Sequence, residues 1–222
     1  NDNNSITFFE ILTAAYFYKA AEYPDNINFI ESGLFHRFDA TNILKENLAS
    51  VVTSVGLDHL DWLPKNEQTV KKIIFEKTST LLDSNIIVAK QGSIEIVNQI
   101  KESIHNNKSK KNFFNENYSY SSIENNFFYY EDKTGGLKLP NPNVNGQFQL
   151  ENISTAIATL RHIKQLDIKN TKLKFYIKDI DNTIEDLVKM FQQPFASATD
   201  EYIYKNDLFD LEGDCGSGCS VF

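Results

Sequence analysis

The sequence predicts an α/β fold, with a mostly parallel sheet that is flanked by helices. A run rich in β-branched residues at 48–55 is typical of a strand buried on both faces, as in a parallel sheet. A second apolar run at 85–90 follows an amphipathic helical pattern. Because strand and helix patterns alternate along the chain, we expect β–α–β units. A small antiparallel element is predicted near 112–146, where the segments NFFYYED and TGGLKL follow one another closely.

The first helix is predicted in TFFEILTAAYFYKAAEY, residues 7–23. Thr7 and Glu10 have the spacing of a capping box, in which each side chain satisfies a free backbone N–H at the start of the helix. One face of this helix is largely apolar, and it holds Phe9, Leu12, Thr13, Tyr16, Phe17 and Ala20. Pro24 ends the helix, and a short strand is expected at 27–31.

The remaining pattern alternates helices with strands. Further helices are expected at 67–82, 93–104 and 150–160. Residues 106–126 are polar and are expected to form a surface loop with short strands at its edges. Beyond Asp167 the pattern weakens, so that 183–191 is expected to be helical and 192–222 mostly irregular.

Composition predicts a soluble globular protein, because the 222 residues are 41% hydrophobic and 23% charged. The net charge of −8 argues against nonspecific binding to nucleic acid or to anionic membranes. No apolar run reaches the roughly 20 residues that span a bilayer, and no signal-peptide pattern is present, so we expect a cytoplasmic location. The chain starts at Asn1 and its single methionine is Met190. We therefore expect that an N-terminal portion has been removed or that this is a piece of a longer protein.

Polar side chains follow the first two predicted strands. Glu31 ends the first strand and is followed by Arg37 and Asp39, while Asp58 and His59 follow the second. In open α/β sheets ligands bind at the carboxyl ends of strands, and a carboxylate with an imidazole could share a divalent metal ion. The alternative is that Asp58 caps a helix and that His59 is an ordinary surface histidine.

Lys77 occupies an unexpected position on the helix predicted at 67–82. It lies at helical spacing from the apolar residues Ile73, Ile74 and Leu81, and therefore on the core-facing stripe. A lysine there normally extends its ammonium group to solvent or pairs with an acid. The neighbouring Glu76 points elsewhere on the helix. The alternative to such an ordinary lysine is a functional lysine close to a metal site.

Five sequence blocks carry a resemblance to a known family. They are FFEILTAAYF, ESGLFHRFDATN, TSVGLDHLDW, IIFEK and NGQFQLENISTAIATLR. In order and spacing they resemble the folylpolyglutamate synthase / dihydrofolate synthase family of the Mur ligase superfamily, whose members are ATP-dependent amide-forming ligases. The resemblance covers residues 7–162 and implies the fold of a Mur ligase-like central domain. The pattern E-x-G-L-x-x-R-x-D-A-T-N is the strongest block, and G-L-D-H with a nearby Trp favours the folate branch.

The resemblance implies an ATP-dependent ligase of folate metabolism. In this family ATP phosphorylates a carboxylate of dihydropteroate or of a folate glutamyl tail, and the amine of L-glutamate attacks the acyl phosphate to form an amide. Glu31 and His59 match the family's Mg²⁺ ligands. Lys77 matches a catalytic lysine that reacts with CO₂ to give a carbamate, which holds a second Mg²⁺. Gln149 and Asn152 match residues near the nucleotide.

The sequence departs from the family pattern at several positions. The family loop has Gly-Gly where this chain has Phe35-His36, and glycines permit positive φ and close backbone approach. Lys77 is followed by Thr-Ser-Thr in place of Ala-Gly-Ile, and Phe148 replaces a histidine. No G-x-x-x-x-G-K-[ST] phosphate loop occurs in the 222 residues.

These departures predict a partial domain. Residues 1–166 are expected to be a central ATPase domain without its N-terminal phosphate loop, which a separate chain could supply. Residues 167–222 are expected to be a divergent tail, whose last four residues from Cys219 fit a prenylation box or match it by accident. We expect an incomplete or degenerate ligase that is inactive alone. The alternative is a non-catalytic binding or interaction module that keeps the ligase fold.

Overall fold

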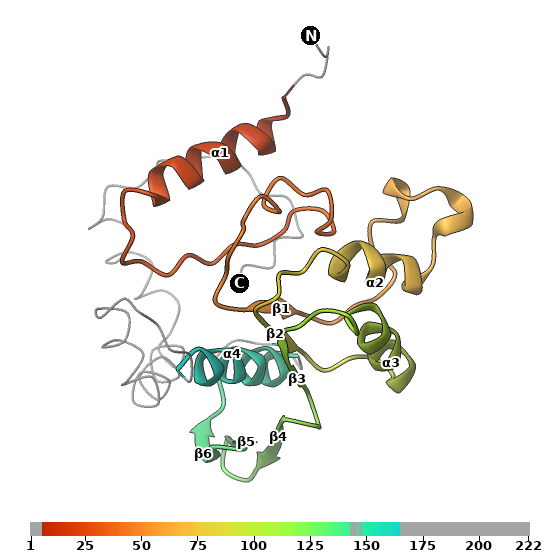
Figure 1. Cartoon of the computed structure of the whole chain (residues 1–222). Helices are drawn as coiled ribbons and strands as arrows, with labels where there is room; N and C mark the ends of the chain where they lie inside the picture. Colours follow the sequence, from red (N-terminus) through yellow and green to blue (C-terminus); the bar gives the residue numbers. More distant parts are fainter. Residues whose placement is uncertain (1–5, 143–145, 147, 165–222) are drawn as a thin grey trace.

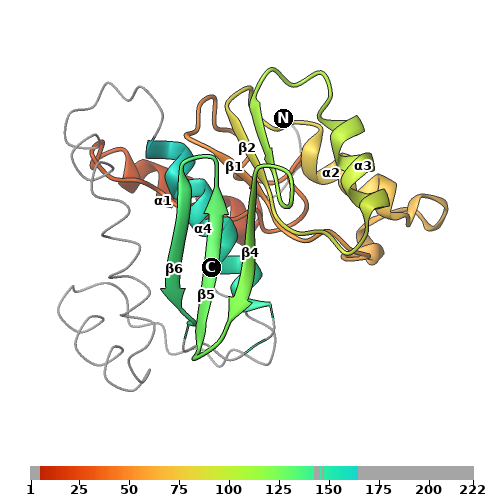
Figure 2. The same ribbon diagram turned by 90° about the horizontal axis from the view of Figure 1, so that it is seen from below.

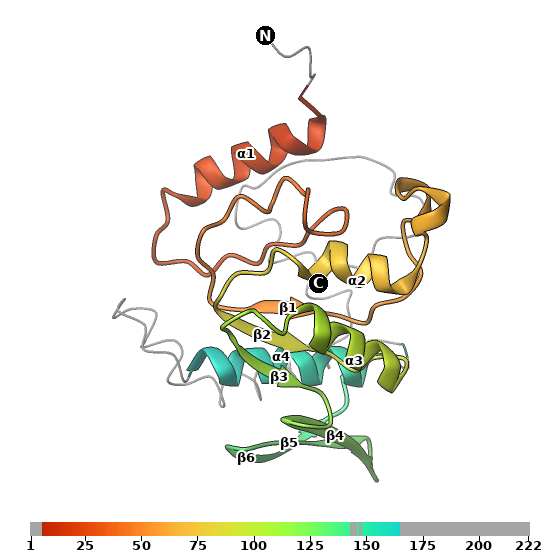
Figure 3. The same ribbon diagram turned by 45° about the vertical axis from the view of Figure 1, so that its right-hand side comes forward.

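The computed structural model describes residues 6–142, 146 and 148–164, so the predictions for 167–222 lie outside the described residues. A parallel sheet carries helices α2 and α3 on one face and α4 on the other, and an antiparallel sheet lies beyond α4 (Figures 1 and 3). The helices are α1 (Phe8–Ala20), α2 (Val70–Thr78), α3 (Ile94–Ser103) and α4 (Gln149–Lys164), with short 3-10 turns at Leu60–Trp62 and Lys65–Glu67. This arrangement confirms the predicted α/β fold class. None of the described helices is long and apolar enough to cross a membrane.

The parallel sheet has the strand order β1-β2-β3, with bounds Ser50–Val52, Asn85–Val88 and Lys110–Phe113. Both pairings are parallel, and Val51 lies opposite Ile87. The central strand β2 is buried along its whole length. Parallel pairing needs a crossover between strands, which α2 and α3 provide.

Two of the predicted strand regions differ in the structure. The strand expected at 27–31 is wrong, because this segment is extended but unpaired, and Phe29 is 83% exposed. A strand needs a neighbour for its backbone hydrogen bonds, and among the described residues none pairs with this segment. The polar stretch 106–126 contains more strand than expected, since β3 completes the parallel sheet at its edge. Lysines and asparagine suit β3 because most of its side chains are only partly buried.

The antiparallel sheet is formed by consecutive strands, β4 (Tyr118–Ile123), β5 (Phe127–Asp132) and β6 (Gly135–Pro140). Figure 2 shows these strands lying across α4. The predicted antiparallel element near 112–146 is confirmed, with one strand more than a hairpin. Gly135 has a φ of 118°, which a residue with a Cβ rarely adopts, and it turns the chain from β5 into β6.

The core consists of two clusters, one on each face of the parallel sheet. Side chains of a strand alternate between faces, so Ile86 and Val88 pack toward α2 and α3 while Ile87 packs toward α4 and the antiparallel sheet. The first cluster also holds Val52, Val55, Ile73, Ile74, Ile100, Ile104 and Phe113. The second holds Tyr118, Phe128, Tyr130, Leu139, Ile157, Ala158 and Ile163. Burial of each large side chain contributes about 1.5–3 kcal/mol.

Helix α1 is formed as predicted but buries little of its apolar face. Thr7 and Glu10 make the predicted capping box. The helix contacts the following segment through the ring of Phe9, which packs against Gly33 so closely that a Cβ on this glycine would lie 2.9 Å from the ring. Large apolar side chains stay exposed on the helix, and they are Phe8, Phe9, Ile11, Leu12, Tyr16 and Tyr18. The expected core-facing stripe is therefore confirmed only at Thr13, which is buried.

A buried ion pair joins α4 to the turn between β5 and β6. Arg161 donates from Nη1 to Asp132 at 3.1 Å, to Thr134 Oγ1 at 3.0 Å and to the Gly135 carbonyl at 2.8 Å. Tyr130 donates its hydroxyl to Asp132 at 2.9 Å. Burial raises the pKa of the Tyr130 hydroxyl, and the neighbouring Asp132 carboxylate raises it further, so this phenol stays a donor.

We predict that Asp132→Asn lowers the free energy of unfolding by about 3–5 kcal/mol, because it removes one charge of a buried ion pair with Arg161. The side chains of Arg161 and Asp132 are only 7% and 10% exposed. Urea unfolding followed by circular dichroism measures the change. The matched control is Glu131→Gln, since Glu131 is the preceding residue and is exposed. Equal effects of the two substitutions would contradict the prediction.

Candidate functional site

The loop at 31–44 is held against α2 by a buried carboxylate. Glu76, only 4% exposed, accepts hydrogen bonds from Arg37 Nε at 2.7 Å and from Nη2 at 2.8 Å. The Arg37 backbone N–H donates to the Glu76 carbonyl at 3.0 Å, and Lys72 Nζ lies 3.2 Å from the carboxylate. These hydrogen bonds, those from Arg37 foremost, lower the pKa of Glu76. The Arg37 guanidinium thus pairs with Glu76.

Asp39 organises the inside of the same loop. Its carboxylate accepts from the backbone N–H of Leu34 at 2.9 Å, from the N–H of Thr41 at 2.9 Å and from the Thr41 hydroxyl at 2.6 Å. Asn42 donates to the Thr80 hydroxyl at 3.0 Å, just beyond the end of α2. Asp39 therefore acts within the loop, and Asn42 adds a second attachment to the helix that carries Lys77.

Phe35 contacts two of the predicted site residues. Its ring lies edge-to-face with the His59 ring at a centroid distance of 5.8 Å. Lys77 Nζ lies 5.9 Å from the centroid of the same ring. The Phe35 backbone has a φ of 55°, in the left-handed region that favours glycine. The structure thus brings Lys77 and His59 to one aromatic ring, although they are 18 positions apart in the sequence.

Lys77 is half-buried on α2, at the edge of the apolar cluster that contains Ile73 and Ile74. Within the part of the chain that the structure describes, its ammonium group has no carboxylate partner and faces the Phe35 ring. Lys77 is thus neither fully extended into solvent nor paired with an acid, the two arrangements that are usual for a lysine on an apolar stripe. It is stabilised in part by a cation–π contact.

Asp58 and His59 form a local pair after β1. The His59 backbone N–H donates to Asp58 Oδ1 at 2.8 Å, and His59 Nε2 lies 3.3 Å from Asp58 Oδ2. His59 has a φ of 51° and begins the 3-10 turn at Leu60–Trp62. Both side chains are exposed, which keeps the interpretation of a surface histidine open.

Glu31 lies at the entrance of the loop. Its side chain is exposed and has no hydrogen-bond or ion-pair partner among the described residues. The next residue, Ser32, contacts His36 Nδ1 at 3.2 Å inside the loop. Within residues 6–142, 146 and 148–164, no three His, Cys, Asp or Glu side chains are arranged to hold a metal ion. The metal site at Glu31, His59 and Lys77 stays a prediction.

Gln149 and Asn152, the predicted nucleotide contacts, lie in the first turn of α4 and are half-buried. Lys90, just after β2, pairs with Glu151 at 2.6 Å and attaches this turn to the end of the strand. The two candidates therefore lie at the carboxyl edge of the parallel sheet, the edge at which the chain also leaves β1 toward His59.

Gln91 is a residue of this edge that the sequence did not single out. Its Oε1 accepts from the Val55 N–H at 2.9 Å, and its Nε2 donates to the carbonyls of Thr53 at 3.1 Å and Ala89 at 2.9 Å. One side chain thus joins the ends of β1 and β2. Its position directly after a predicted strand was the signal that could have identified it.

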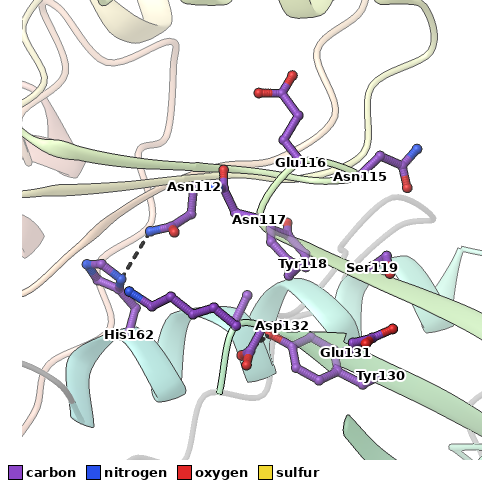
Figure 4. A pocket seen from close by; sticks show the side chains of 12 residues that line it. Asn112, Asn115, Glu116, Asn117, Tyr118, Ser119, Tyr130, Glu131, Asp132 and His162 are labelled. Carbon is purple, nitrogen blue, oxygen red and sulfur yellow. Dashed lines mark hydrogen bonds between the residues drawn. The ribbon is translucent and has the colours of Figure 1, made fainter. Parts of the chain in front are cut away.

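An open pocket of about 350 Å³ lies on the opposite face of the sheet, between α4 and the turns beside β4 and β5 (Figure 4). Its wall includes His162, whose Nδ1 lies 3.0 Å from Asn112 Nδ2 and whose Nε2 lies 2.6 Å from Asn85 Oδ1. Burial lowers the pKa of His162, and the charges of Lys110 and Lys133 lower it further. A neutral imidazole that donates from Nε2 and accepts at Nδ1 satisfies both contacts. His162 is a structural link between α4 and the sheet.

Comparison with known proteins gives a consistent set of relatives. No protein-family model matches the chain. It is 27% identical over 185 residues to the dihydrofolate synthase/folylpolyglutamate synthase of Buchnera aphidicola subsp. Schizaphis graminum, covering 80% of this chain and 40% of that protein. The structure of apo L. casei FPGS superposes with a TM-score of 0.61 at 24% identity, covering 73% of this chain and 40% of that one.

A second solved structure, E. coli FolC in complex with DHPP and ADP, is 28% identical with a TM-score of 0.56, covering 79% of this chain and 40% of that one. The chain thus spans about two fifths of the length of these relatives. The resemblance to the folylpolyglutamate synthase / dihydrofolate synthase family is confirmed over this part, and so is the Mur ligase-like fold.

We predict that Glu76→Gln lowers the free energy of unfolding by about 1.5–3 kcal/mol at neutral pH, because it removes charge-assisted hydrogen bonds to Arg37. Since the pKa of Glu76 is lower in the folded state than its ordinary 4.5, the advantage of the wild type is complete above that value. It disappears as the pH falls through the folded-state pKa. Urea unfolding of both proteins between about pH 7 and pH 3 measures this difference.

The matched control is Glu67→Gln, which removes the exposed carboxylate 2.7 Å from Lys72. It should change stability by no more than about 1 kcal/mol. A Glu76→Gln difference that persists unchanged in acid would show that the carboxylate charge is not the stabilising feature.

Proposed function

We propose that this chain is part of the central domain of an ATP-dependent ligase that adds L-glutamate to dihydropteroate or to folylpolyglutamate. The observation that carries the proposal is the shared edge of the sheet. Gln149 and Asn152, which match the family's nucleotide contacts, begin a helix attached to the end of β2, and His59, which matches a metal ligand, follows the neighbouring parallel strand β1. The E. coli relative is a complex with DHPP and ADP, which supports the substrate class. A cytoplasmic location is part of the same proposal.

The proposed reaction has two steps. A carboxylate oxygen of the folate substrate attacks the γ-phosphorus of ATP, which gives an acyl phosphate and ADP. The amine of glutamate then attacks the acyl carbon, so that the C–N bond forms and phosphate leaves. Both steps build negative charge that cationic groups must stabilise. In this proposal Gln149 and Asn152 position the nucleotide.

Mg²⁺ and a carbamylated Lys77 are the groups that the family would supply, and their fit to this chain is poor. Mg²⁺ prefers six oxygen ligands, several of them water. Lys77 and His59 instead contact the apolar ring of Phe35, and Glu31 stands exposed at the loop entrance. We therefore propose no step through a metal ion in this chain as it stands.

We propose further that the chain is an incomplete or degenerate copy of the ligase. The 222 residues contain no phosphate loop, and a separate chain could supply one. Helix α1 supports this, because its exposed apolar side chains offer a surface for additional polypeptide. Among the described residues β1 is also an open sheet edge.

A non-catalytic binding or interaction module is the second candidate. The observation that favours it is Phe35, which replaces a glycine of the family loop and contacts both Lys77 and His59. Such a module would keep the fold and a surface for partners while the reaction is lost.

We predict that the isolated chain does not join glutamate to dihydropteroate or to tetrahydrofolate in the presence of ATP, Mg²⁺ and bicarbonate. A phosphate loop supplies backbone N–H groups and a lysine to the phosphates. The loss of each such contact typically costs several kcal/mol of transition-state stabilisation. Amide formation is measured by mass spectrometry of the product, with a complete ligase as the positive control.

The same assay is repeated with a separately expressed phosphate-loop segment. Turnover that requires the added segment would support a split enzyme, and no turnover in either case would support the non-catalytic module. Turnover by the isolated chain that is lost on Lys77→Ala would contradict the prediction.

A further inference from the structure

Phe35 is held in a backbone conformation that bulky residues rarely adopt. A non-glycine residue with a φ of 55° persists only where its surroundings determine it. Here the backbone is held on both sides, because the Leu34 N–H donates to Asp39 and, two residues after Phe35, the Arg37 N–H donates to the Glu76 carbonyl. The surrounding loop therefore determines the direction of the Phe35 side chain.

The ring fills a space between the loop, α2 and the turn after β1. It is half-buried and packs against the apolar cluster that contains Val52 and Val55. On the polar side it contacts His59 edge-to-face and Lys77 through its ammonium group. Phe35 thus occupies volume next to both side chains.

The face of the Phe35 ring also disfavours an anion at the end of Lys77. The face of an aromatic ring carries partial negative charge, which attracts an ammonium group. Formation of a carbamate requires the neutral amine to attack the carbon of CO₂, with formation of an N–C bond and loss of a proton to solvent. The product is an anion, which the same ring face repels. A carbamate on Lys77 would therefore bring an anion against the face and into the volume of the Phe35 ring.

We propose that Phe35 is a positioning residue whose ring occupies the space that a carbamate on Lys77 would need and prevents Lys77 and His59 from sharing a divalent cation. The inference deepens the proposed function, on which it rests for the role of Lys77. On this view, a single side chain, that of Phe35, is what prevents metal binding by this chain. Removal of the ring should then open a site for a divalent cation.

The test is Phe35→Gly, because glycine adopts a φ of 55° without strain. Binding of Mn²⁺, used as a spectroscopic probe for Mg²⁺, is measured by electron paramagnetic resonance in ¹³C-bicarbonate. We expect at least tenfold tighter binding than in the wild type, together with a new carbamate carbon signal in the ¹³C NMR spectrum. Both gains should disappear in Phe35→Gly with Lys77→Ala. A folded Phe35→Gly protein without either gain would overturn the proposal.

The matched control is Phe38→Gly, which removes a ring of the same loop that is 82% exposed and stacks on Arg37. It should leave Mn²⁺ affinity unchanged within twofold and give no carbamate signal. An equal gain in this variant would show that loosening of the loop, and not the Phe35 ring, is the cause.

A measurement on the chain with Phe35 intact keeps the proposal testable if Phe35→Gly does not fold. His59→Ala and Lys77→Ala should each change its Mn²⁺ affinity by less than twofold. A carbamate signal in the wild type that Lys77→Ala abolishes would overturn the proposal, as would a fivefold loss of Mn²⁺ affinity in His59→Ala. None of these readouts uses amide formation, so failure here is distinct from failure of the proposed ligase function.

Discussion

The buried carboxylate of Glu76 is the constraint on which the candidate site depends. A carboxylate withdrawn from water is unfavourable unless cations and hydrogen-bond donors compensate it. Arg37 supplies two hydrogen bonds and Lys72 a further charge. Because Arg37 belongs to the loop and Glu76 to α2, satisfying this one charge fixes the loop on the helix. The position of Phe35 beside Lys77 follows from that attachment.

The central strand β2 imposes a second constraint, since it is buried on both faces. Its side chains alternate between two apolar clusters, one on each face of the sheet. The polar residues beside one cluster are therefore kept apart from those beside the other. Lys77 and Phe35 belong to the α2 face, while His162 and its pocket belong to the α4 face. His162 is hydrogen-bonded at both ring nitrogens, and burial lowers its pKa. Both nitrogens are therefore used to link α4 with the sheet.

Local patterns predicted those elements whose stability is local or whose burial is complete. The capping box of α1 and the buried strand β2 are examples, because spacing and β-branched residues carry the signal directly. The polar β3 and the unpaired 27–31 segment were not predictable in this way, since strand formation depends on a neighbour elsewhere in the chain. The pairing of Arg37 with Glu76 joins residues 39 positions apart. Lys77 was identified from its place on an apolar stripe, whereas its aromatic partner required the fold.

The loop separates its anchoring residues from those that face the candidate site. Arg37, Asp39 and Asn42 make the bonds that set its shape, and none of these bonds uses the side chain of Phe35. The family's glycine can therefore be replaced by a phenylalanine while the loop stays attached, with the left-handed backbone of Phe35 as the local energetic cost. The change falls on the charge and volume around Lys77 and His59. Under the proposed role of Phe35, the fold and the attachment of the loop are kept while the space beside Lys77 and His59 is filled.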